Sequence, residues 1–395
     1  GPKVNTSAEY DGSSWTAAAT SPLTRAAGGR SGTQTAALFF GGVPGNPNGT
    51  ATLTYDGTTF SLDPASMSTP TGGMSSSTNG SSTAAWMSSA SLVTEEYNKA
   101  NTVITAAAFA AGGNLNSARK SMYGGTVGTQ TAGLAFGGNP GPGANSALNE
   151  EYDGTSWTES GDLNTARTYF AGFGIQTAAV GCGGYVFGGG GNTNVTEEYD
   201  GSSWSNGNNI NTTRRALAGC GTLTAGLIFG GFISPPHSNA TEEYDGTNWT
   251  SSPGNLNTVT ELHGGAGTQT AGLSFNGDGG GPNPTQTEEY NGSTWTVGGA
   301  NIKQAEGVAS AGSQTAALSM GGANPPSSYL TTVTAYDGTT WSTRPSMSTA
   351  RWETSGGGTQ TAGLVFGGGT APVTAATEEF TGETTTANVK TFSTS

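Results

Sequence analysis

Basic residues are scarce in this sequence. Its 395 residues include 13 Lys and Arg against 27 Asp and Glu, which gives a formal net charge of −14 at pH 7. A nucleic-acid-binding protein needs a basic surface to contact phosphates, and binding to an anionic membrane surface needs one as well. A run of about 18 apolar residues, which a membrane-spanning helix requires, is also missing. We therefore predict no nucleic-acid partner and no membrane insertion.

Histidine and cysteine are equally rare, with two of each. His263 falls within an expected strand, where we expect it to be packed, and His237 falls in a Pro-rich loop, where we expect it at the surface. Neither has neighbours spaced for a Ser–His–Asp arrangement. Cys182 and Cys220 have no nearby His to complete a zinc site, so we expect free buried thiols, with a disulfide as the alternative. We predict that the protein is not an enzyme and has no catalytic, cofactor-binding or metal-binding residues.

Helical periodicity is the third absence. No window places apolar residues at the spacing of an amphipathic helix, so we expect almost no helix. Glycine is abundant instead, with 67 residues. The Gly-rich stretches follow expected strands without opening a helix, so they are not typical of a phosphate-binding loop. Aromatic residues return at fixed places, which argues against a disordered chain.

Four short segments recur at intervals of about 46 residues. The first follows an Arg and is rich in small residues, as in Arg25 to Gly32. The second reads TQTAxLxFGG, as in Thr129 to Gly138. The third ends in Tyr or Phe, and the fourth usually holds a Trp. The third-segment aromatic residues are Tyr10, Tyr55, Tyr97, Tyr152, Tyr199, Tyr244, Tyr290, Tyr336 and Phe380.

These segments predict strands, because each is short and bounded by Gly, Asn, Asp or Ser. Asp-Gly or Asn-Gly joins the third to the fourth, which is a tight-turn signal, so each repeat is expected to be a four-stranded antiparallel meander. The second segment occurs eight times, although its copy at Ser82 to Ala90 is degenerate. Eight copies of a four-stranded repeat predict an all-β protein, a β-propeller of eight blades. The alternative is seven blades plus an extra unit.

Gly-Gly after a hydrophobic strand, followed by Tyr and then Trp, resembles the kelch repeat over nearly the whole chain. The wording of the repeats, TQTAGLAFGG with EEYDGTSW, is similar to the kelch-like repeats of virion structural and tail proteins in marine bacteriophages, including cyanophages. The resemblance implies a propeller fold. It also implies a virion component, such as a fibre, a capsid decoration or a host-adhesion protein.

Packing expectations follow from the shape of a propeller. Inner strands lie close to the axis, where Gly, Ala and Ser permit close approach. Tyr and Trp rings are expected to fill the wider gap between blades. The two Glu of TEEY face opposite ways in a strand, and we expect one of each pair to meet an Arg or backbone amides between blades.

The residues of this expected framework fall at equivalent places in the repeats. The candidate Arg partners are Arg119, Arg167, Arg214 and Arg351, and other repeats have Thr71, Thr260 and Glu306 at that position. The remaining structural positions are Trp15, Trp157, Trp204, Trp249, Trp295, Trp341, Tyr152, Tyr199, Tyr244, Tyr290 and Glu198.

We predict one propeller domain over residues 1–395 and consider two ways to close it. The preferred closure pairs the N-terminal half-blade, 7–16, with the first two strands of the last repeat, 351–368. Residues 377–395 then remain as a spare half-blade or tail. The alternative closure completes the last repeat and leaves the N-terminal hairpin outside the ring.

The loops on one end of the expected ring vary, whereas the GTQT and DGSS turns on the other end hardly change. Function commonly resides on variable loops held by a rigid scaffold. Apolar and aromatic side chains in these loops predict partner contacts, and the alternative is that they fold over their own blades. The candidate residues are Tyr185, Phe187, Phe232, Ile233, His237, Tyr329 and Leu330.

We therefore expect a non-enzymatic structural or binding protein located in a virion or outside the cell. Its expected partners are other virion or filament subunits, identical or different, and a glycan or protein on a host surface. Self-assembly is expected because a spare half-blade can complete a neighbour's sheet edge. The alternatives are a subunit of an extracellular bacterial filament and a carbohydrate-binding, lectin-like propeller.

Overall fold

The computed structural model describes residues 5–24, 28–42, 49–63, 65–68, 70, 75–76, 81, 84–88, 94–98, 102–280, 285–324, 328–370, 372–387 and 393–394. The regular structure of these residues is entirely β-strand, which confirms the predicted all-β class. No helix in this part of the chain is long and apolar enough to cross a membrane.

The chain divides into two compact units, where we expected one domain over 1–395. The larger unit is Ala106–Glu383, and the smaller unit combines Gly1–Thr105 with Thr384–Ser395. Two strands of the smaller unit, β10 (Thr102–Thr105) and β40 (Thr384–Ala387), pair with each other in an antiparallel ribbon. Each of these segments follows a third strand and was expected to complete a meander. The ribbon takes both of them out of the sheets.

The described residues of the larger unit contain six sets of four antiparallel strands, each close to one repeat in length, and we call each set a sheet. Four of the sets are separate sheets, whereas the second and third below belong to one nine-stranded sheet. The first is β13 (Gly128–Thr129), β14 (Ala132–Phe136), β15 (Asn149–Tyr152) and β16 (Trp157–Ser160). The second is β17 (Phe170–Ile175), β18 (Ala178–Cys182), β21 (Thr196–Tyr199) and β22 (Trp204–Asn206), and the third is β23 (Ala218–Thr222), β24 (Ala225–Phe229), β25 (Thr241–Tyr244) and β26 (Trp249–Ser251). The fourth is β27 (Gly264–Thr268), β28 (Ala271–Phe275), β29 (Thr287–Tyr290) and β30 (Trp295–Val297), and the fifth is β31 (Ala309–Ser313), β32 (Ala316–Met320), β35 (Val333–Tyr336) and β36 (Trp341–Arg344). The sixth contains β37 (Ser355–Gly358), β38 (Ala362–Phe366) and β39 (Thr377–Thr381).

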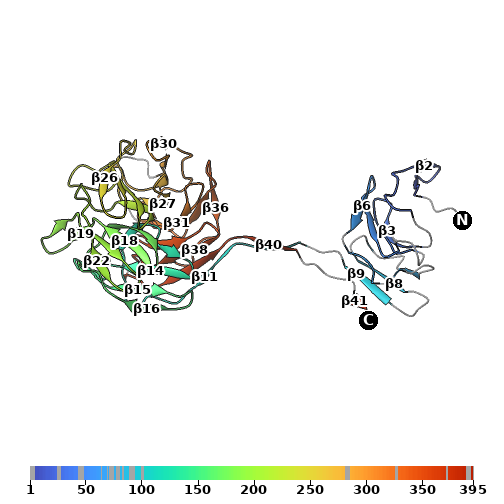
Figure 1. Cartoon of the computed structure of the whole chain (residues 1–395), viewed down its shortest axis with the longest axis horizontal. Helices are drawn as coiled ribbons and strands as arrows, with labels where there is room; N and C mark the ends of the chain where they lie inside the picture. Colours follow the sequence, from blue (N-terminus) through green and yellow to red (C-terminus); the bar gives the residue numbers. More distant parts are fainter. Residues whose placement is uncertain are drawn as a thin grey trace. The chain divides into compact units, whose positions relative to one another are not determined.

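The sixth sheet takes its outer strand from the other end of the larger unit. Strand β11 (Ala108–Ala111) lies antiparallel to β39, with Phe109 opposite Phe380 (Figure 1). The structure therefore lacks the expected closure of residues 7–16 against 351–368. Strand β11 of the larger unit completes the sixth sheet instead. Residues 377–381 are also part of this sheet, so the expected spare half-blade 377–395 is divided between β39, the ribbon strand β40 and the smaller unit.

The innermost strands of the six sheets contact one another in a closed circuit. Strand β17 contacts β23, and the succession continues through β27, β31 and β37 to β13, which contacts β17 again. Strand β12 (Tyr123–Gly125), just before β13, pairs in parallel with both β17 and β23 and joins their sheets. At Gly125, with φ 127°, a Cβ would lie 2.3 Å from the Gly219 carbonyl oxygen, so only glycine fits there. The arrangement is propeller-like, with small residues lining its centre as predicted.

Aromatic side chains fill the spaces between these sheets, as predicted from the repeats. Tyr152, Tyr199, Tyr244, Tyr290 and Tyr336 are at most 1% exposed. The Trp residues that begin the outer strands pack on the preceding sheet, as where Trp295 contacts Phe229 with ring centroids 4.8 Å apart. The five Trp residues of this type are Trp157, Trp204, Trp249, Trp295 and Trp341.

The smaller unit contains the remaining repeats. Its first sheet is only a hairpin, β1 (Ala8–Tyr10) with β2 (Trp15–Ala17), and its second is β3 (Gly29–Thr33), β4 (Ala36–Phe40), β5 (Thr52–Tyr55) and β6 (Phe60–Asp63). The third is β7 (Ser75–Ser76), β8 (Ala84–Ser88), β9 (Thr94–Asn98) and the C-terminal β41 (Ser393–Thr394). Trp15 is 72% exposed, so the expectation that every Trp is packed between blades is wrong for this residue. Most of the loop 43–52 and the ends of the degenerate copy at 82–90 lie outside the described residues.

Candidate functional site

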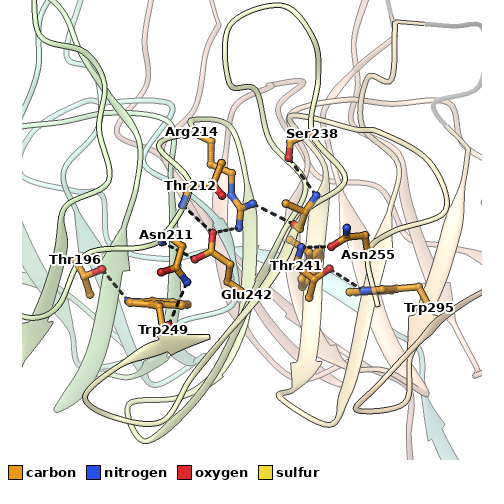
Figure 2. Close-up of polar contacts among 12 residues, drawn as sticks. Thr196, Asn211, Thr212, Arg214, Ser238, Thr241, Glu242, Trp249, Asn255 and Trp295 are labelled. Atoms are coloured by element: carbon orange, nitrogen blue, oxygen red, sulfur yellow. Dashed lines mark hydrogen bonds and ion pairs between the residues drawn. The ribbon is translucent and has the colours of Figure 1, made fainter. Parts of the chain in front are cut away.

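In several sheets of the larger unit, a buried ion pair joins the segment just before the first strand to the third strand of the same sheet. Figure 2 shows Glu242 between the guanidinium of Arg214, 3.2 Å away, and the backbone N–H of Thr212. The same pair recurs at 2.5–2.9 Å as Arg119–Glu150, Arg167–Glu197 and Arg351–Glu378. All four Arg side chains are fully buried, and the predicted Arg partners are confirmed. Each pair joins a connection to its own sheet, whereas we expected it to lie between blades.

Two sheets lack this Arg. Thr260 occupies its place in the fourth sheet, where Glu288 still accepts from the backbone N–H groups of Asn257 and Thr258. In the fifth sheet the equivalent residue is Ala305, because Glu306 forms the bridge that Arg215 forms in the third; our alignment of Glu306 with the Arg was wrong by one residue. Thr71, expected at the same position, lies outside the described residues.

In the fifth sheet, Lys303 replaces the missing Arg as the hydrogen-bond donor to the connection, although it lies two residues before the Arg position. Its buried ammonium donates to the carbonyl oxygens of Ser319, Gly321 and Thr332, at 3.1, 2.9 and 3.3 Å. Arg351 donates to the equivalent carbonyls of Gly367 and Ala376 in the sixth sheet. The carbonyl groups of the connection are thus satisfied in both sheets by a cation.

The second Glu of each TEEY segment links neighbouring sheets. Glu198, the predicted structural residue, accepts a hydrogen bond from the hydroxyl of Tyr244 in the next sheet. The same bond joins Tyr199 to Glu151, Tyr290 to Glu243, Tyr336 to Glu289 and Tyr152 to Glu379, at 2.5–2.6 Å. Between the fifth and sixth sheets both partners are replaced together, by Ala335 and Phe380, and the contact is apolar.

A Gln in the GTQT turn forms a second link between neighbouring sheets, at the end of the sheets opposite to the variable loops. The side-chain amide of Gln269 donates to the carbonyl oxygens of Gly226 and Tyr244 in the preceding sheet, at 3.1 and 2.8 Å. Gln130, Gln176, Gln314 and Gln360 make the equivalent bonds. Leu223 stands at this place in the third sheet and packs against the core. The sequence showed that this turn hardly changes, but we assigned its Gln no role.

Six residues surround the centre of the larger unit on the side of the variable loops, and we call them the axial ring. They are Ser121, Tyr169, Ala216, Leu262, Gly307 and Glu353, and all have φ between 49° and 61°. In five of the six residues, the backbone N–H donates a hydrogen bond to the carbonyl oxygen of the preceding ring member, at 2.6–2.9 Å. Five non-glycine residues in this strained conformation mark the ring as a candidate functional region.

Charged residues gather around Glu353 in the axial ring. Its carboxylate accepts from the hydroxyls of Ser121 at 2.5 Å and Tyr169 at 2.9 Å, and pairs with Lys120 at 2.8 Å. Burial, with the nearby carboxylates of Asp278, Glu261 and Glu353 in support, raises the pKa of Glu306 to about 7. Sequence reasoning missed this cluster. The residue after the Arg position, which is charged in four of the six repeats (Lys120, Arg215, Glu261 and Glu306), was the available signal.

The predicted loop residues lie next to this cluster. Arg215 lies over two aromatic rings, with its guanidinium carbon 5.0 Å from the centroid of Tyr185 and 4.5 Å from that of Phe232. Phe187 contacts Tyr185 edge-on and exchanges two backbone hydrogen bonds with the side chain of Asn145. These three aromatic side chains are half-buried. Much of their surface therefore packs within the protein, in line with the alternative that the loops fold over their own sheets.

The other predicted loop residues differ in exposure. Ile233 is 39% and Tyr329 is 42% exposed, and Tyr329 stacks on Trp352, the residue over which Lys120 lies. The ring of His237 lies 3.7 Å from the carboxylate of Glu261. Leu330 is partly buried and packs against a hydrophobic core cluster. Among the described residues of these loops, Ile233 and Tyr329 are therefore the large apolar side chains exposed to solvent.

The centre itself has little room for a ligand. The cavity beneath the axial ring has a volume of about 40 Å³, enough for a few water molecules. Its wall includes His263, which is fully buried between the Ser274 hydroxyl and the Phe229 carbonyl, as expected for a packed residue. Cys182 and Cys220 are free and buried, and burial raises the pKa of both thiols. No cluster of three or more His, Cys, Asp or Glu suited to a metal ion occurs among the described residues.

The site is thus a broad face around the axial ring, with mixed charges at its centre and aromatic loops at its edge. No protein-family model matches the sequence, and no curated protein matches it significantly.

Proposed function

We propose that the larger unit is a closed six-bladed propeller and that the protein is a non-enzymatic structural or binding module. The loop face around the axial ring is its partner-binding surface. The Arg–Glu pairs and the Tyr–Glu and Gln links repeat from sheet to sheet, while the loops on this face differ in length and composition. A constant framework under varied loops is the organisation expected of a recognition scaffold.

The observation that carries the proposal is the exposure of Ile233 and Tyr329 on this face, with Tyr329 stacked on Trp352 beneath the partly exposed Lys120. Exposed apolar side chains rimmed by polar groups are typical of protein interaction surfaces. The wording of the repeats supports the setting, because it resembles virion structural and tail proteins of marine phages. The proposed location is therefore a virion or the cell exterior, and the proposed partners are other subunits or a host-surface molecule.

Imaging of the native source material tests the setting. Antibody fragments raised against the chain are expected to decorate virions in cryo-electron micrographs. Decoration of cell-surface filaments would instead favour the filament alternative. Saturable binding to one sugar class on a glycan array, with no particle labelled, would favour the lectin alternative and contradict the virion proposal.

A paired set of variants tests the face itself. Ile233→Ser combined with Tyr329→Ser is expected to abolish attachment to the labelled particle, because both replace the exposed apolar side chains of the loop face. Val297→Ser is the matched control, since Val297 is 70% exposed on the outer strand β30, away from the loops. Equal attachment by all three proteins would contradict the proposed binding face.

A further inference from the structure

The hairpin β1–β2 in the smaller unit corresponds to the outer half of a repeat. It carries the sequence AEYDGSSW, as the third and fourth strands do elsewhere, and its Tyr10 and Trp15 rings pack 5.1 Å apart, as Tyr152 and Trp157 do at 4.9 Å. Its sheet has only these two strands in the described part of the chain, whereas each complete repeat places two small-residue strands on the inner side of the third strand. The inner strands of this repeat are therefore not among the described residues.

The hairpin nevertheless lies against the next sheet in the way that a complete neighbour does. The hydroxyl of Tyr55 in β5 donates to the carboxylate of Glu9 in β1. This is the same link that joins Tyr244 to Glu198 in the larger unit. The outer strands of the two repeats are thus in their usual relation, and the place of the inner strands can be located by equivalence.

That place is an open cleft. It has a volume of about 510 Å³ and lies between β1 and the sheet β3–β6, lined by Glu9, Gln34, Ala37, Phe39 and Tyr55 among others. Gln34 is the equivalent of Gln269, which donates to the second and third strands of the preceding sheet. Gln34 is exposed and has no hydrogen-bond partner among the described residues. The group that recognises a preceding inner strand is therefore present, and no such strand lies against it among the described residues.

The backbone of β1 is oriented to receive a strand. Ser7 and Asp11 use their backbone groups to bond β2, through Ala18 N–H to Ser7 O and Asp11 N–H to Ser14 O. Backbone direction alternates along an antiparallel strand, so Ala8 and Tyr10 direct theirs to the opposite edge, which faces the cleft. An open strand edge is a template for pairing with another chain. In complete repeats the residue equivalent to Glu9 lies opposite a Leu, as Glu289 lies opposite Leu273.

We propose that this cleft binds a β-hairpin of the inner-strand type, carried by a partner polypeptide. The partner hairpin adds to β1 by backbone hydrogen bonds, with its Leu opposite Glu9, and its carbonyl groups accept from Gln34. Small residues are required near the turn, because the equivalent Gly272 lies against Leu227 of the preceding sheet with no space for a Cβ. The inference extends the assembly role in the proposed function but uses only contacts within the smaller unit.

The test uses the full-length chain and a fluorescein-labelled peptide with the sequence of residues 264–277, an inner hairpin of this protein. Fluorescence anisotropy is expected to show saturable binding, and a scrambled peptide of the same composition is expected not to bind. Ala8→Pro removes the N–H that faces the cleft and is expected to weaken binding by at least about tenfold. Ala8→Val keeps that N–H and is expected to bind like the parent protein.

Each other result overturns the proposal. Absence of saturable binding to the parent protein would do so, as would equal binding of the scrambled peptide or equal affinity in Ala8→Pro. Circular dichroism of Ala8→Pro confirms that its sheets are retained. The loop variant Ile233→Ser/Tyr329→Ser is expected to bind the peptide normally, so a failure of the loop-face proposal and a failure at the cleft are distinguishable.

Discussion

The hydroxyl of Tyr244 and the carboxylate of Glu198 show how single residues connect neighbouring sheets. A phenol and a carboxylate that bond to each other in a partly buried site contribute more than a neutral pair. The joint replacement by Ala335 and Phe380 at one interface indicates that the two groups act as a unit. The repeat pattern predicted where the Tyr and Glu lie. It did not predict this pairing, because the two residues belong to different repeats and meet only in the folded ring.

Tyr244→Phe is expected to destabilise the larger unit by about 1–3 kcal/mol, because the carboxylate of Glu198 loses its donor. Adding Glu198→Ala reproduces the pair Phe380 and Ala335 and is expected to recover part of that loss. Urea unfolding of the parent, both single variants and the double variant measures the coupling. If the double variant lost as much as the two single variants summed, the two residues would not act as a unit.

His263 gives the protein an acid-sensitive contribution to stability. Burial lowers its pKa from 6.5 to about 3 in the folded state, whereas the unfolded chain takes up the proton near pH 6.5. The contribution is therefore complete above pH 6.5 and is lost as the pH falls from 6.5 towards 3, by about 1.4 kcal/mol per pH unit.

Urea unfolding between pH 7 and pH 5, above the range where most carboxylates titrate, measures this loss. His263→Gln is expected to be less stable at pH 7 but to lose less stability on acidification than the parent. Val297→Ser, an exposed substitution that changes no ionisable group, is the control and is expected to keep the parental slope. An unchanged slope in His263→Gln would show that His263 is not the group responsible.

At the scale of elements, the four-stranded meander was predicted correctly because each strand carries its own signal. Tyr, Trp and Gly-Gly fix strand type and order, and the Asp-Gly turn fixes the register of the outer pair, as Tyr152 opposite Trp157 shows. Elements without these signals were not predicted. Strand β11 reads AFAA, with no Trp and no preceding Asp-Gly turn, so nothing in the sequence identified it as the outer strand of the sixth sheet.

The turn Gln offers a prediction at this scale. Gln269→Leu is expected to cost less than about 1 kcal/mol, because Leu223 already occupies the equivalent place and packs on the core. Gln269→Ala is expected to cost more, since it leaves the carbonyl groups of Gly226 and Tyr244 without their donor and adds no packing. Thermal unfolding compares the two variants. Equal losses would contradict the exchange of hydrogen bonds for packing.

At the scale of the whole molecule, local patterns do not decide which repeats share a ring. The second and third strands pair at the same register from repeat to repeat, as Leu227 opposite Glu243 and Leu273 opposite Glu289 show, so the sequence permits several closures. The structure selects a larger unit closed by β11 on β39 and a smaller unit whose first described repeat consists of the outer hairpin β1–β2. The loop residues of the candidate face were predicted, since their variability is visible in the sequence. The axial charges were not, because only closure brings Lys120 beside Glu353.

A disulfide-trapping experiment tests this closure most directly. Ala108 lies opposite Thr381 across the β11–β39 pair, and both are exposed. Facing positions in an antiparallel pair lie close enough for a disulfide. The protein with Ala108→Cys and Thr381→Cys is expected to form one under mild oxidation, with the buried Cys182 and Cys220 unreactive. The competing closure of residues 7–16 on 351–368 instead places Asp11 opposite Ala362. Disulfide formation by Ala108→Cys/Thr381→Cys and not by Asp11→Cys/Ala362→Cys is the predicted result, and the reverse would contradict the closed larger unit.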